Sequence, residues 1–176
     1  SAAMGFGQAT DNANHDVTIT INEMALIKFA GAAPVLEITA PGTDGDQAVE
    51  PAANSAIYLQ YTSLVAGTVA VPTYKNIEVA FTGDAVPDGV DLGIGVTLGA
   101  PGGGNIGSVV AGGPWDVETI GAGSQAIIED ITSGYTGSTG TDGANITFTL
   151  TLDGTAYADL REASANVTVT YTIADQ

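Results

Sequence analysis

The sequence predicts an all-β protein that folds as a single antiparallel β-sandwich, Ig-like or jelly-roll-like, with about eight to ten strands. Three observations predict this class. Apolar and polar residues alternate along most of the chain, with the period of two that half-buried strands require. Turn signals rich in glycine and aspartate separate the alternating runs. Only residues 157–164 have a helix-like composition, which predicts one or two helical turns at most.

The first alternating run begins after a polar leader. Residues 1–14 lack alternation, and we expect them to be flexible, whereas residues 15–176 form the single predicted domain. In residues 15–22 every second side chain is β-branched and apolar, and the same parity continues to residue 29. The residues that share this face are Val17, Ile19, Ile21, Ala25, Ile27 and Phe29. The pattern predicts one long strand over residues 15–29, or two strands joined by a bend.

The remaining strands follow in order. A short apolar run predicts a strand at 35–39, and clearer alternation predicts strands at 55–63, 75–82, 90–98, 146–152 and 167–173. Weaker patterns indicate strands at 115–120 and 125–131. Between them lie two long loops, residues 99–114 and 132–143, which are rich in glycine, and in serine and threonine in the second case. Loops of this length are often functional.

Charge excludes several classes of function. The 176-residue chain has 20 acidic and three basic residues, for a net charge of −17. Binding to nucleic acid requires lysine and arginine to neutralise phosphates, so we expect no nucleic-acid partner. No stretch is long and apolar enough to span a bilayer, so membrane insertion is not expected either. Cysteine is absent, which rules out disulfides and thiolate chemistry.

Candidate chemical groups are few, and each has a simpler structural explanation. His15, the only histidine, is more typical of a solvated strand end than of a general base. The glycine-rich loop at residues 102–107 lacks the Lys-Ser/Thr ending of a phosphate-binding loop. We therefore expect no enzyme activity and no cofactor. The weak calcium candidates are four turn aspartates, which are more simply explained by local hydrogen bonding: Asp44, Asp46, Asp84 and Asp88.

The two ends of the chain carry a resemblance to a known group of proteins. Residues 166–173, N-V-T-V-T-Y-T-I, follow a threonine-rich strand, and residues 8–14 form a polar segment ahead of the first alternating run. This arrangement resembles secreted bacterial pilin-like and spore-coat-U-like β-sandwich subunits. The resemblance implies an incomplete sandwich, completed by a terminal strand of a neighbouring subunit. It also implies that the protein is extracellular and that any signal peptide has been removed.

The resulting expectation is a structural subunit of an extracellular filament or pilus-like surface assembly. Such a subunit polymerises with copies of itself by β-strand exchange, and residues 15–29 are the candidate donor strand. The alternative for this segment is that it pairs within its own subunit. The alternative for the whole protein is a monomeric secreted module that binds calcium or a glycan on a host or neighbouring cell surface. Trp115 and the loop 99–114 are the candidate site of that module.

Overall fold

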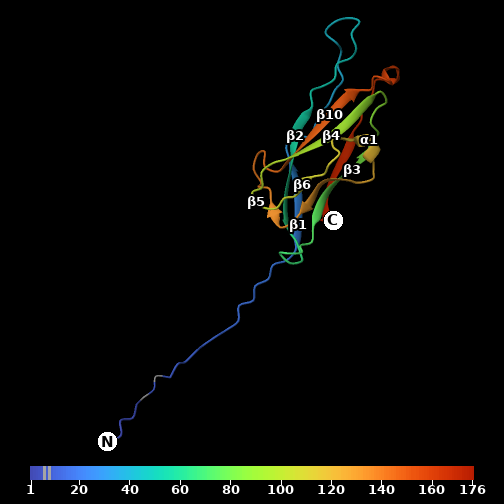
Figure 1. Ribbon diagram of the computed structural model, residues 1–176. Coiled ribbons are helices and arrows are strands. Elements are labelled where there is room, and N and C mark those ends of the chain that lie inside the picture. Colours follow the sequence, from blue (N-terminus) through green and yellow to red (C-terminus); the bar gives the residue numbers. More distant parts are fainter. Residues whose placement is uncertain (6, 8) are drawn as a thin grey trace.

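The computed structural model describes residues 1–5, 7 and 9–176. Phe6 and Gln8, two residues of the predicted leader, lie outside the described residues. Two antiparallel sheets pack face to face and form an elongated body, from which the N-terminal segment projects as an extended tail (Figure 1). The predicted all-β sandwich is therefore confirmed. We refer to residues 1–23, which precede the first strand, as the tail.

The larger sheet contains seven strands. They are β1 (Met24–Ala30), β2 (Asn54–Leu64), β4 (Val90–Leu98), β5 (Gly103–Gly104), β7 (Trp115–Asp116), β9 (Gly134–Tyr135) and β10 (Ala144–Leu152). Their hydrogen-bonded order is β5-β9-β2-β10-β4-β7. β9 and β10 pair with successive parts of one edge of β2, and β1 pairs with its opposite edge. The smaller sheet has the order β11-β3-β8-β6, with bounds β3 (Lys75–Gly83), β6 (Ser108–Val109), β8 (Gln125–Ile131) and β11 (Val167–Asp175).

The core lies between the two sheets and follows from the alternation in the sequence. Because successive side chains of a strand point to opposite faces, alternate residues of the long strands enter the interior, except in β8, where a register shift against β3 accompanies the burial of both Ile127 and Ile128. The fully buried apolar side chains come mainly from β2, β3, β8 and β10, and include Leu59, Ile77, Ile127 and Ile146. The opposite faces carry threonine and other polar residues, which suit a solvated pleated surface.

Two local predictions are wrong in detail. Residues 115–120 form β7 followed by a single helical turn, α1 (Val117–Ile120), because the Asp116 side chain accepts a hydrogen bond from Thr119 N at 2.7 Å and caps it. Residues 35–39 contribute only an isolated bridge between Thr39 and Val49. At residues 157–164, where the sequence predicts one or two helical turns at most, the chain forms a single 3₁₀ turn, η1 (Tyr157–Asp159). The long loops contain the short strands β5, β6 and β9.

The edges of the sandwich differ sharply between its two sides. On one side the sheets end in β5, β7 and β6, each of which is two residues long. On the other side they end in β1 and β11, with seven and nine residues. These two strands contact each other across the sandwich, so both long edges open on the same side. Short edge strands commonly protect a sheet against pairing with further strands, and the side that ends in β1 and β11 lacks this protection. We call the side with β1 and β11 the open side.

Candidate subunit interface

The free edge of β11 presents a continuous row of backbone groups. Asp84 N donates to Asn166 O and Gln176 N donates to Tyr74 O, each at 3.0 Å, so even-numbered residues of β11 bond to β3. Antiparallel ladders alternate between bonded and non-bonded pairs. The N–H and C=O groups of the odd-numbered residues therefore point away from β3, toward the open side. Among the described residues, β11 pairs with no second strand.

The side chains along this edge are apolar and incompletely covered. The odd-numbered residues face the core, and all of them but the last are apolar: Val167, Val169, Tyr171, Ile173 and Asp175. None is fully buried, whereas Ile77 and Val79, their neighbours on β3, are 0% exposed. Burial still raises the pKa of the Tyr171 phenol above its ordinary value, because the charged form would be poorly solvated there. The core thus thins out at β11 without a covering strand.

The facing edge, β1, shows the same deficiency. Phe29 pairs with Leu59 of β2 and lies on the same, core-facing side of the sheet. Leu59 is 0% exposed, but Phe29 is 59% exposed. A core-facing aromatic side chain with this exposure lacks a neighbour on the open side. Both long edges of the open side therefore carry core-facing apolar side chains that are only partly covered.

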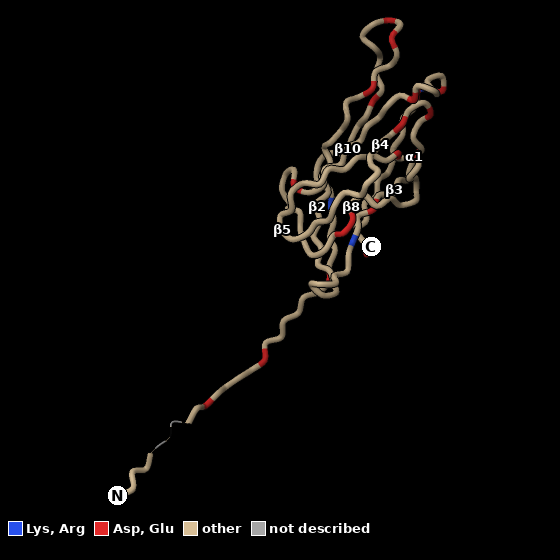
Figure 2. Tube along the Cα trace, viewed as in Figure 1, with Lys and Arg blue, Asp and Glu red and all other residues tan. Residues whose placement is uncertain are grey.

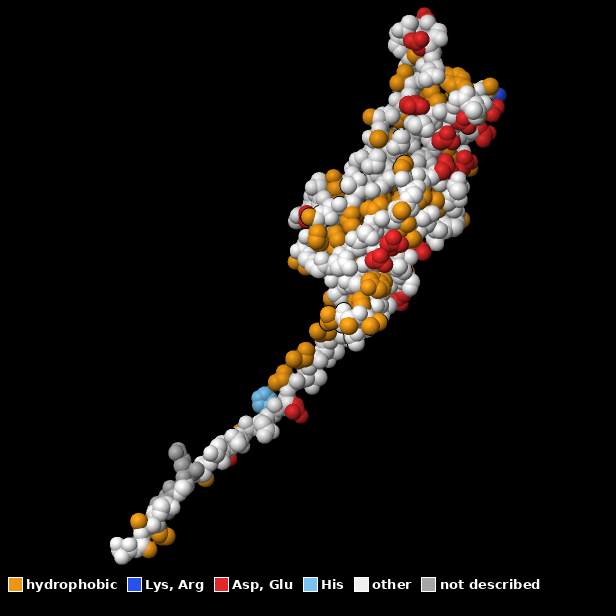
Figure 3. Space-filling model, viewed as in Figure 1, with side chains coloured by type: hydrophobic (Ala, Val, Ile, Leu, Met, Phe, Trp, Pro, Cys, Tyr) orange, Lys and Arg blue, Asp and Glu red, His pale blue; other side chains and the backbone are white. Residues whose placement is uncertain are grey.

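The tail carries an apolar stripe that nothing in the described chain covers. Val17, Ile19 and Ile21 are 72%, 82% and 79% exposed, and residues 9–23 have no secondary-structure partner. The other parity is polar, with Asp16, Thr18, Thr20 and Asn22. Hydrophobic side chains are visible along this part of the tail, up to the body (Figure 3). The segment thus has the alternation of a strand with one buried face, but no sheet to bury it.

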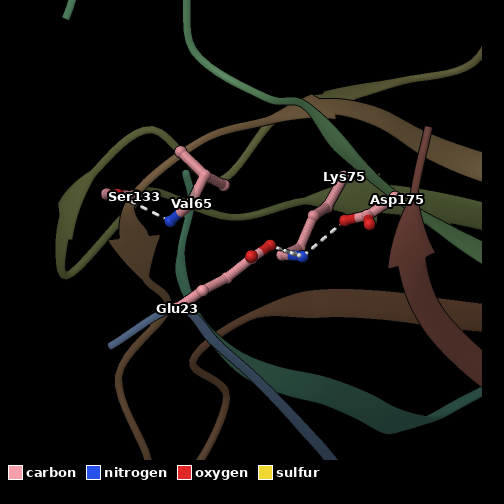
Figure 4. A network of polar contacts seen from close by, with 5 residues as sticks. All are labelled: Glu23, Val65, Lys75, Ser133 and Asp175. Atoms are coloured by element: carbon pink, nitrogen blue, oxygen red, sulfur yellow. Dashed lines mark hydrogen bonds and ion pairs between the residues drawn. The ribbon is translucent and has the colours of Figure 1, made fainter. Parts of the chain in front are cut away.

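Two ion pairs fix the point at which the tail leaves the body. Lys75 Nζ lies 2.7 Å from Glu23 Oε1 and 2.7 Å from Asp175 Oδ1 (Figure 4). The hydrogen bonds to Asp175 and Glu23 raise the pKa of Lys75 above its ordinary value. The lysine side chain is 6% exposed, while the two carboxylates are 41% and 66% exposed, so its stem is buried and its charged end meets solvated partners. One lysine of β3 thereby ties the root of the tail to the end of β11.

The predicted donor residues fall into two groups. Ala25, Ile27 and Phe29 belong to β1, which pairs with β2 of the same chain in antiparallel register. These three residues therefore follow the alternative prediction, in which the segment pairs within its own subunit. Val17, Ile19 and Ile21 lie in the tail and pair with nothing among the described residues. The strand predicted over residues 15–29 is therefore wrong in its first half. Residues 15–23 form no strand, and β1 begins only at Met24, next to Glu23, which Lys75 holds.

The other candidate residues are not brought together. Asp44 and Asp46 are exposed in the loop between Thr39 and Val49, while Asp84 accepts a hydrogen bond from Asn166 N at 2.9 Å. Asp88 lies in the turn before β4. No group of three or more metal-ligating side chains occurs within residues 1–5, 7 and 9–176. His15 is exposed on the tail, and Trp115 is half-buried against the core.

Two parts of this interface are not among the residues singled out in the sequence. Lys75 lies two and four residues before Ile77 and Val79, so it is on the same, core-facing side of the strand. A lysine at a core-facing position is unusual, and this spacing could have identified it from the sequence. The free edge of β11 leaves no such signal, since alternation is the same for edge and central strands.

In the described part of the chain, no helix has the length and apolar character needed to cross a membrane. Comparisons with protein-family models, curated proteins and solved structures found no match.

Proposed function

We propose that this protein is a structural subunit of an extracellular filament or pilus-like surface assembly, joined by β-strand exchange. In this proposal residues 16–23 of one copy bind the open side of the next copy, along β11. The single observation that supports it is that the same chain has both a long, uncovered strand edge and an exposed apolar stripe. The extracellular location rests on the resemblance to secreted pilin-like subunits.

The donor segment and the acceptor edge are complementary. The free edge of β11 offers backbone donors and acceptors at every second residue, which is what an added strand requires. The donor adds Val17, Ile19 and Ile21 on one face, which would cover the half-buried side chains of β11. Complete burial of one such side chain contributes about 1.5–3 kcal/mol. The polar donor face, including Thr18 and Thr20, would continue the threonine surface of β11.

Exchange between copies is favoured over folding back within one chain. To reach its own β11, the donor would have to reverse direction between Ile21 and Met24. Residues 8–30 contain neither glycine nor proline, so Asn22 is the one residue inside the required turn that favours tight turns. Glu23, inside the required turn, is held by Lys75. The segment therefore continues away from its own body and is available to another copy.

The topology sets the direction of the added strand. β1 and β11 run in opposite directions, because each is antiparallel to its partner and β2 leads into β3 through a turn at one end of the body. The tail continues the direction of β1. When copies repeat by translation along the tail, the donor enters antiparallel to β11 and parallel to β1. A contact of this head-to-tail kind does not close on itself and generates a filament.

A pair of matched substitutions tests the proposal. Ile19→Asp places a charge on the donor face that would enter the core, and Thr20→Asp adds the same charge on the outward face. Lost burial of the isoleucine and desolvation of the aspartate raise the concentration needed for polymerisation by at least about a hundredfold in Ile19→Asp. Thr20→Asp should polymerise within a few-fold of the unmodified chain.

Sedimentation and negative-stain microscopy of the three proteins give the readout. Filaments of the unmodified chain and Thr20→Asp, with a folded monomer for Ile19→Asp, support strand exchange. Circular dichroism checks that Ile19→Asp keeps its β structure. A strictly monomeric unmodified chain, or equal polymerisation of all three proteins, contradicts the proposal.

A further inference from the structure

A short connection between the sheets lies next to the root of the tail. Residues 65–74 join β2 to β3, and we call them the connecting hairpin. Its position follows from its two ends, since Leu64 pairs with Met24 and Lys75 binds Glu23. In Figure 1 the hairpin lies where the tail meets the body. Any molecule that binds the tail close to its root therefore approaches the connecting hairpin.

The connecting hairpin is held in one conformation by its own hydrogen bonds. Thr68 N donates to Val71 O at 3.0 Å, Val71 N donates to Thr68 O at 3.2 Å, and Thr73 N donates to Ala66 O at 3.0 Å. Gly67 has a φ of +91°, and a Cβ there would clash with Val71 O. At its start, Val65 N donates to Ser133 Oγ at 3.1 Å (Figure 4). The hairpin thus presents its tip as a defined surface.

That surface is apolar and uncharged. Residues 65–74 contain no acidic or basic side chain, although the whole chain has a net charge of −17. Val69 is 105% exposed and Val71 is 74% exposed, and Met24 and Tyr74 at the base of the hairpin are also exposed. Figure 3 shows hydrophobic side chains gathered at this end of the body. Single exposed valines are ordinary, but an ordered apolar cluster of this kind is typical of a binding surface.

The covalent geometry brings a second copy to this surface once the donor is bound. Only Asn22 and Glu23 separate Ile21, the last donor side chain of the stripe, from β1. Two extended residues span about 7 Å, so no flexible spacer separates the donor from its own body. The accepting copy must then lie against the end of the donor copy that carries the connecting hairpin.

Charge favours the same arrangement. Most acidic residues lie toward the end of the body remote from the tail, whereas this end has the Lys75 ion pairs and an uncharged hairpin (Figure 2). Two copies of an acidic protein repel each other least where one of the contacting surfaces carries no charge.

We infer that the connecting hairpin is a second docking surface, which packs against the copy of this chain that accepts the tail. This inference rests on the proposed strand exchange and adds a body-to-body contact to it. In the filament Val69 and Val71 are buried between consecutive subunits. The contact fixes the angle between subunits, which a single strand joint would leave free to bend.

Thiol labelling tests this contact directly, because the chain contains no cysteine. Val69→Cys places a single thiol at the tip of the hairpin, and Ser124→Cys places one at an exposed site in the turn between α1 and β8. Each is labelled with a maleimide in the filament and in a monomer prepared by adding Ile19→Asp. Because a buried thiol reacts only when it becomes accessible, labelling of Val69→Cys should slow at least about tenfold in the filament.

Ser124→Cys should label at similar rates in both states, which controls for general shielding by the polymer. Filaments in which Val69→Cys labels as fast as in the monomer overturn the hairpin contact and leave strand exchange standing. Failure of the unmodified chain to form filaments overturns strand exchange, and the hairpin contact with it.

Discussion

The burial of Lys75 predicts which of two changes to its ion pairs destabilises the protein more. The first variant, Lys75→Met, removes the cation but keeps the volume of the lysine stem. The second, Glu23→Ala with Asp175→Ala, removes both anions and leaves the lysine. The structure predicts that the second variant is the less stable one, because the lysine is 6% exposed and the carboxylates are 41% and 66% exposed.

The magnitudes follow from the same exposures. Ion pairs whose carboxylates are well solvated contribute about 0.2–1 kcal/mol each, so Lys75→Met should lower the free energy of unfolding by about 1 kcal/mol. Methionine also spares the cost of desolvating an ammonium group. A buried ammonium left without partners is more costly, and we expect about 2–3 kcal/mol for the double variant after allowance for water that enters beside the lysine.

Urea unfolding in the Ile19→Asp background, which keeps the protein monomeric, provides the assay. Trp115 is the only tryptophan and is half-buried, so its fluorescence reports unfolding. The double variant should shift the midpoint by about 1 M urea and Lys75→Met by about half as much or less. The reasoning is refuted when Lys75→Met proves as destabilising as the loss of both carboxylates.

Two further predictions concern the body alone. The free energy of unfolding should fall as the pH rises above about 10, because burial raises the pKa of the Tyr61 and Tyr171 phenols and hydrogen bonds to Asp175 and Glu23 raise that of Lys75. Groups with a raised pKa contribute stability below their ordinary value that is lost as the pH passes their folded value. Urea midpoints at pH 8 and pH 11, with tyrosinate absorbance, check this, and equal midpoints contradict it. Gly143→Ala should cost several kcal/mol, because its Cβ would clash with a backbone carbonyl of β2 at a φ of +99°. Gly45→Ala, with a φ of +93° in open space, should cost about 1 kcal/mol, and similar unfolding midpoints for the two variants would count against the close approach of Gly143 to β2.

The sequence was sufficient for the long strands and insufficient for features that depend on partners. Alternation located β10 and β11 closely, because one face of each strand meets the core. The run at 35–39 has similar residue types, but Val35 is exposed, and within the described residues the run makes only the single bridge from Thr39 to Val49. A strand needs a neighbour to bond with, and composition does not specify one. The strands β5, which is two glycines, and β9, which is Gly134–Tyr135, are too short to show an alternating side-chain pattern.

The helical turn α1 shows a different limit. Val117 and Ile120 are spaced as on one face of a helix, yet four residues are too few for a period to be distinguished from a short strand. The Asp116 cap decides in favour of the helix.

The donor residues show a third limit. Alternation predicts that Ile19 and Ile27 are each buried on one face, but it does not say whether the sheet that buries them belongs to the same chain.

Amide hydrogen exchange along β11 tests strand exchange most directly, since it reads the acceptor edge itself. Filaments are exposed to D₂O and dissolved, and the retained protons are assigned by NMR, with the Ile19→Asp monomer as the reference. The account predicts that the amides of Val169, Tyr171 and Ile173 are protected only in the filament, while those of Thr170 and Thr172, bonded to β3, are protected in both states. Odd-numbered amides that exchange equally fast in filament and monomer would contradict a strand bound along this edge.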